Sequence, residues 1–156
     1  MSPEGCLLLT AVKAVTTVLL AAALAVTLAG CGSKSARAQY VDRLNAMCED
    51  FAAREQQIGE PSTQEDLAAR GDRIVAAFEQ TILEPLQHVK APPEVAPQAA
   101  QLRVLARQQR DVLRGLAEAG RSGDVAKVGQ LSARNTTLNA QAGRIAHDLE
   151  ADSCAS

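Results

Sequence analysis

Cys31 is the side chain with the most specific chemistry in this sequence, because of the residues that precede it. Residues 14–28 form an uncharged run interrupted only by threonines, and Leu28, Ala29 and Gly30 lead directly into the cysteine. At about 1.5 Å per residue this run reaches only about 23 Å, less than the roughly 30 Å of hydrocarbon that a spanning helix must cross. A short apolar segment that ends in small residues is typical of a cleaved export signal. The alternative is a retained signal anchor extended through Gly30.

The Leu28-Ala29-Gly30-Cys31 sequence resembles the signal peptides of bacterial lipoproteins, whose box reads Leu, a small residue, Gly or Ala, and Cys. The resemblance implies cleavage after Gly30 and a diacylglyceryl group on the sulfur of Cys31. Two or three acyl chains make a firm membrane anchor. We therefore expect a signal peptide over residues 1–30, a lipidated cysteine with a polar tether over 31–37, and a domain over 38–154. The expected location is the extracytoplasmic face of the cell membrane.

Two cysteines remain for a disulfide under this interpretation. Cys6 leaves with the signal peptide and Cys31 carries lipid, so Cys48 and Cys154 can pair only with each other. The compartment outside the membrane permits such a bond. Two free thiols or a metal pair are the alternative, but no other cysteine or nearby histidine completes a metal-ligand set.

The composition bounds the fold and excludes some ligands. The 156 residues contain 16 Lys and Arg against 18 Asp and Glu, so no excess of positive charge points to nucleic acid. One Tyr, two Phe and no Trp leave almost no aromatic surface on which bases or sugar rings could stack. The core must therefore be built from Leu, Val, Ile and Ala.

Four segments carry apolar residues at spacings of three, four and seven, which is typical of amphipathic helices. The first ends at Gly59, and the second begins at the capping-box pattern Ser62-Thr63-Gln64-Glu65. The third follows Ala91-Pro92-Pro93, and the fourth follows a turn over residues 120–123 with Asp124 as N-cap. The predicted apolar faces are Tyr40, Leu44, Met47, Phe51 and Ile58; Leu67, Gly71, Ile74, Phe78, Ile82, Leu86 and Val89; Val95, Ala99, Leu102, Ala106, Leu113 and Leu116; and Val128, Leu131, Asn135, Leu138, Ala142, Ile145 and Leu149.

Four such amphipathic helices joined by short loops predict an all-α fold, an antiparallel up-down four-helix bundle. Pro85 is expected to kink or end the second helix. The alternative is a long three-helix arrangement in which that helix is broken at Pro85. Small helical lipoproteins of actinobacterial type are similar, with an early Cys, a Pro-Pro break and a terminal Cys.

No catalytic constellation is recognisable. His147 is predicted to point away from the last apolar face, so Met47 and His147 do not form a haem-ligand pair, and the other histidine is His88. The sequence has no Gly-x-Ser-x-Gly elbow and no phosphate-binding loop. We therefore expect a protein that is not an enzyme and that has no metal and no cofactor.

A basic ridge on the third helix is one feature that could bind a partner. Arg103, Arg107, Arg110 and Arg114 lie about 120° or more from the apolar face. The ridge could bind anionic lipid headgroups, an anionic polymer or an acidic envelope protein. The alternative is a solvated face, stabilised by Arg107–Asp111 and Arg114–Glu118 pairs.

Polar residues inside the predicted apolar faces are the second such feature. Glu55, Gln109 and Asn135 would each need partners if buried. They indicate either a polar network that fixes helix register or a pocket for a small ligand between the helices. Two functions follow: a lipid-anchored interaction or structural module, which the sequence favours, and a carrier or sensor of a small or lipidic ligand. A contiguous apolar cavity would favour the carrier or sensor.

Overall fold

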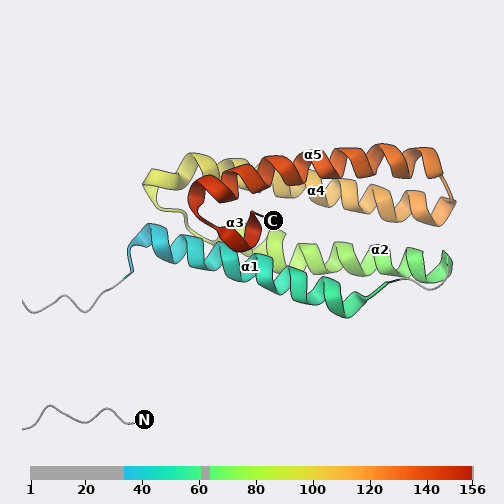
Figure 1. Cartoon of the computed structure of the whole chain (residues 1–156), viewed down its shortest axis with the longest axis horizontal. Helices are drawn as coiled ribbons and strands as arrows, with labels where there is room; N and C mark the ends of the chain where they lie inside the picture. Colours follow the sequence, from blue (N-terminus) through green and yellow to red (C-terminus); the bar gives the residue numbers. More distant parts are fainter. Residues whose placement is uncertain (1–33, 61–63, 156) are drawn as a thin grey trace, which may run out of the picture. The chain divides into compact units, whose positions relative to one another are not determined.

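The amphipathic segments after Cys31 all form helices in the computed structural model, which describes residues 34–60 and 64–155. This part of the chain is helical and contains no strand, which confirms the predicted all-α class. Four helical segments make it up: α1, a continuous run from α2 through α3, α4, and α5 (Figure 1). The predicted signal peptide, Cys31, and Ser62 and Thr63 of the predicted capping box lie outside the described residues.

Local chemistry sets both ends of α1, Ala36–Ile58. The Ser35 hydroxyl oxygen accepts a hydrogen bond from the Ala38 N–H at 3.1 Å, which satisfies one of the unpaired donors of the first turn. Gly59 follows the last residue at φ 69°, a conformation that glycine adopts without strain, and its N–H donates to the Glu55 carbonyl. Gly59 therefore ends the helix as predicted.

The second helical segment passes through Pro85 without ending. It comprises α2, Gln64–Phe78, a π-helical turn η1, Glu79–Leu83, and α3, Glu84–His88. Proline lacks an N–H, and its ring would clash with the carbonyl four residues earlier in a regular α-helix. The wider π turn ahead of it relieves this conflict, with the Glu84 N–H bonded to the Glu79 carbonyl. The expectation that Pro85 could end this helix is wrong.

Short connections join the remaining helices. The 3₁₀ turn η2, Pro93–Val95, leads into α4, Ala96–Ser122, which ends at Gly123 in the left-handed conformation. The Asp124 carboxylate then accepts the Lys127 N–H at 3.0 Å and starts α5, Val125–Leu149, as predicted. The turn expected over residues 120–123 is shorter than predicted, because one left-handed glycine is enough to reverse the chain.

The core lies where these segments meet. Contacts join α4 to α5, α2 to α4, and α1 to α2. The buried residues of the core come from all four segments and follow most of the predicted apolar faces. They are Tyr40, Leu44, Phe78, Leu83, Leu86, Val89, Val95, Ala99, Ala106, Ala146, Leu149 and Ala151. In the described part of the chain, no helix is long and apolar enough to cross a membrane.

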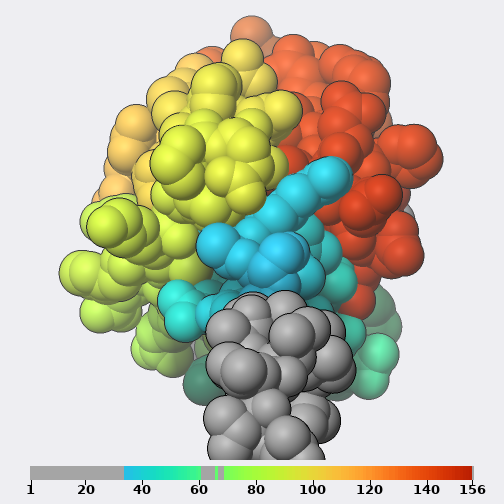
Figure 2. Space-filling model, turned by 90° about the vertical axis from the view of Figure 1, so that its left-hand side faces the viewer, coloured from blue at the N-terminus to red at the C-terminus, as the bar shows by residue number. Residues whose placement is uncertain are grey.

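The chain end folds back after α5. Glu150 adopts φ 66°, and the Ala151 N–H donates to the Ala146 carbonyl, so the helix terminates and the chain turns. A last 3₁₀ turn, η3, Asp152–Cys154, then packs against α1. Figure 2 shows the start of α1 (blue) between the yellow-green segment around α3 and the red end of α5. At this end of the domain the Arg37 guanidinium lies 3.4 Å from the Glu150 carboxylate.

Tyr40 is a polar residue at the centre of this end of the core. Its side chain is 2% exposed, and its hydroxyl has no hydrogen-bond partner among the described residues. Burial raises the pKa of this phenol, and the nearby Arg103 charge partly offsets the increase. Because the folded state resists ionisation of Tyr40, it loses stability as the pH rises above about 10, where the unfolded phenol ionises.

Tyr40→Phe should therefore leave the unfolding free energy unchanged at neutral pH or raise it by about 1 kcal/mol, because it removes an unsatisfied buried hydroxyl. The variant should also lose less stability than the original protein between neutral pH and about pH 11. Urea unfolding followed by circular dichroism at both pH values measures the two effects. A loss well above 1 kcal/mol at neutral pH would contradict the prediction.

Candidate ligand pocket

A disulfide joins the two ends of the domain. Cys48 on α1 bonds to Cys154 on η3, with the two Cα atoms 5.4 Å apart and 106 positions separating them in sequence. Ser153 reinforces the junction, because its N–H donates to the Asn45 side chain at 3.1 Å and its hydroxyl donates to Glu49 at 2.8 Å. The predicted pairing is confirmed.

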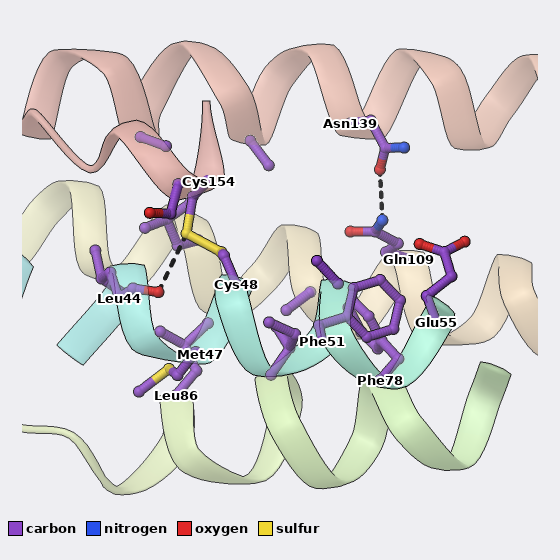
Figure 3. Close-up of a pocket in the computed structure, with 17 residues that line it drawn as sticks. Leu44, Met47, Cys48, Phe51, Glu55, Phe78, Leu86, Gln109, Asn139 and Cys154 are labelled. Atoms are coloured by element: carbon purple, nitrogen blue, oxygen red, sulfur yellow. Dashed lines mark hydrogen bonds between the residues drawn. A yellow bond between two sulfur atoms is a disulfide. The ribbon is translucent and has the colours of Figure 1, made fainter. Parts of the chain in front are cut away.

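A pocket of about 330 Å³ lies beside this disulfide, within the range of small-molecule sites in proteins (Figure 3). All four helical segments and η3 contribute to its wall. Most of the wall is apolar, and the Phe51 and Phe78 rings meet edge to face with centroids 5.6 Å apart. The lining residues are Leu44, Met47, Cys48, Phe51, Ala52, Glu55, Phe78, Ile82, Leu86, Leu102, Ala106, Gln109, Asn139, Ala142, Ala146, Ser153 and Cys154.

Polar side chains from three helices gather at one end of the pocket. Glu55 comes from α1, Gln109 from α4 and Asn139 from α5, and the Gln109 amide nitrogen donates to the Asn139 side-chain oxygen (Figure 3). The sequence pointed to Glu55 and Gln109 but selected Asn135 instead of Asn139. Asn135 lies one turn earlier on α5, does not line the pocket, and has a buried side-chain oxygen without a hydrogen-bond partner in the described structure.

The arginines of the predicted ridge have different surroundings. Arg103 donates from its guanidinium to the carbonyls of Leu86 at 3.0 Å and Val89 at 2.8 Å, and so caps the end of α3. Arg110 pairs with Asp111 at 2.7 Å on its own helix.

The other two arginines of the ridge also differ from each other. Arg114 pairs with Glu79 of η1 at 2.6 Å, whereas Arg107 is exposed. The contacts that Arg110 and Arg114 make are thus not the Arg107–Asp111 and Arg114–Glu118 pairs expected for a solvated face. Whether the ridge binds an anionic partner stays a prediction.

The remaining candidate residues lie in different parts of the domain. His147 is 78% exposed and 3.9 Å from Asp148, as its predicted outward orientation requires, and His88 is also exposed. Met47 lines the pocket. Within residues 34–60 and 64–155, no group of three or more His, Cys, Asp or Glu side chains is placed to hold a metal ion.

Comparison with family models, curated proteins and solved structures finds no match for this chain. The kind of protein is therefore described by its fold and pocket alone. It is a disulfide-linked, all-helical domain with a pocket that is mostly apolar and has polar side chains at one end.

Proposed function

We propose that this chain is a lipid-anchored, non-catalytic protein of the cell envelope that binds a small or lipidic ligand between its helices. The pocket is the observation that carries this proposal, because a contiguous apolar cavity distinguishes a ligand carrier or sensor from a purely structural module. An interaction role through the arginine ridge has less support, since Arg103, Arg110 and Arg114 already have partners within the domain.

The proposal includes an antiparallel up-down arrangement of the four helical segments. The single connection through Gly123 and Asp124 favours antiparallel packing of α4 against α5, and short links join the other neighbours. In this arrangement the Cys48–Cys154 bond links the first helix to the segment after the last. The pocket then lies inside the bundle, where such proteins commonly hold their ligands.

The anchor is supported by the N-terminal sequence and by the disulfide. Bonds of this kind persist mainly in oxidising compartments, which fits a domain exported across the membrane. Cys31→Ala should abolish acylation and release the protein from the membrane fraction. Intact mass and detergent partitioning of the protein from cells measure both effects, and an unmodified full-length chain in the original protein would contradict the anchor.

Ligand binding is tested by filling the pocket. Ala142→Leu adds volume at the lining, so the affinity for hexanol, a small neutral probe, should fall about tenfold. Ala100→Leu makes the same change at an exposed position of α4 outside the pocket and should have no effect. Calorimetric titration of the full chain in phosphatidylcholine nanodiscs, with empty nanodiscs as the blank, gives the affinities. Thermal unfolding of both variants checks that the fold is retained.

If neither hexanol nor charged probes with the same alkyl chain bind to the original protein, the ligand-binding proposal is contradicted. Equal affinities in Ala142→Leu and the original protein would place any binding elsewhere and would contradict the assignment of this pocket.

A further inference from the structure

The lining of the pocket carries formal charge of one sign only, which is negative. Of the 17 residues that line it, Glu55 alone carries a formal charge, and none is Lys, Arg or His. Figure 3 shows Glu55, Gln109 and Asn139 together at one end, while Leu44 and the disulfide lie toward the other. A bound molecule therefore meets a carboxylate and two amides at one end and mostly apolar side chains along the rest of its length.

The hydrogen-bonding capacity of this polar end is only partly used. The bond between Gln109 and Asn139 consumes one donor and one acceptor, so in either orientation of the two amides one carbonyl oxygen and one amino group remain. The Glu55 carboxylate has no ion pair or hydrogen bond among the described residues, whereas the Glu49 carboxylate bonds to Ser153 and that of Glu79 pairs with Arg114. Two acceptors, the carboxylate and an amide oxygen, are thus left without a donor.

We infer that the pocket selects a single-chain amphiphile with a primary ammonium head group. This inference rests on the proposed ligand-binding function and adds the chemical class of the ligand. An ammonium offers three donors and a positive charge, which match the Glu55 carboxylate and the amide oxygen. Because Glu55 is exposed, the charged head stays partly hydrated and its desolvation cost is small.

The apolar part of the ligand follows from the rest of the lining. An alkyl chain directed away from Glu55 would contact Phe51, Phe78 and Leu86, which are buried or half-buried. A carboxylate or phosphate head would instead lie beside Glu55, and no lining cation could offset the repulsion between like charges. Fatty acids and other anionic amphiphiles should therefore be rejected.

The test compares hexylamine, hexanol and hexanoate, which share an alkyl chain and differ in the charge of the head group. Each is titrated calorimetrically at neutral pH into the full chain in phosphatidylcholine nanodiscs, with empty nanodiscs as the blank. The original protein should bind hexylamine most tightly and hexanoate most weakly. Glu55→Gln keeps the shape of the side chain and should weaken hexylamine binding about fivefold, with hexanol binding unchanged.

Glu118→Gln is the matched control, because it removes the same charge from an exposed position of α4 outside the pocket, and it should leave all three affinities unchanged. Hexanoate binding as tightly as hexylamine, or hexylamine binding that Glu55→Gln does not weaken, would overturn the inference while leaving the ligand-binding function standing. If none of the three probes binds, the proposed function itself fails and the inference fails with it.

Discussion

Replacing both bonded cysteines, with Cys48→Ala and Cys154→Ala, should lower the unfolding free energy of the full chain by about 3–5 kcal/mol. The bond joins positions 106 residues apart, so it restricts nearly the whole domain in the unfolded state. On the folded side, η3 would lose its covalent link to α1 but would still pack against it and keep the two hydrogen bonds of Ser153. For a domain of this size such a loss is a large part of the total stability.

Urea unfolding followed by circular dichroism measures the effect. The unfolded state without the bond is more expanded, so the slope of the free energy against urea should also rise. Reductant should shift the unfolding midpoint of the original protein toward that of the double variant and leave the variant itself unchanged. Coincident midpoints for the oxidised protein and the variant would contradict the prediction.

The ends of the helices could largely be predicted from sequence, because they depend on neighbouring residues. Gly59 ends α1 through its own positive φ of 69°, and Asp124 starts α5 by accepting a hydrogen bond from an N–H three residues later. Pro85 is different. Its backbone conflict is relieved by a π turn on the preceding residues, and two buried side chains of that turn, Thr81 and Leu83, hold it in place. Apolar periodicity alone does not distinguish such a turn from a break.

The candidate site could be predicted only in part, for a similar reason. Glu55 and Gln109 interrupt apolar faces, so their positions along the helices indicated a polar feature inside the fold. The choice between Asn135 and Asn139 depends on the rotation of α5 against α4, which the sequence does not determine. The role of Arg103 depends likewise on carbonyls that lie 14 and 17 residues earlier in the chain. Helical periodicity assigns that arginine to a polar face without revealing its acceptors.

The close contact between α2 and α4 should tolerate no side chain at Gly71. A Cβ atom at this position would lie 2.9 Å from the Cβ of Ala117 and 3.1 Å from its Cα, and neither atom can move without shifting α4. Ala117 is itself buried, at 6% exposure. Gly71→Val should therefore lower the unfolding free energy by about 2–3 kcal/mol, because the two helices must separate and the contacts around them loosen.

Gly129→Val provides the matched control, because it makes the same change within α5 at an exposed position with nothing within 4 Å. Valine forms helices slightly better than glycine, so the control should be neutral or more stable by up to about 0.5 kcal/mol. Urea unfolding of both variants beside the original protein measures the difference. Equal effects at the two positions would show that helix propensity alone governs the change, and that α2 and α4 do not pack as closely at Gly71 as the structure places them. A loss confined to Gly71→Val would mean that glycine is needed there for the approach of two helices, and not for the flexibility of one.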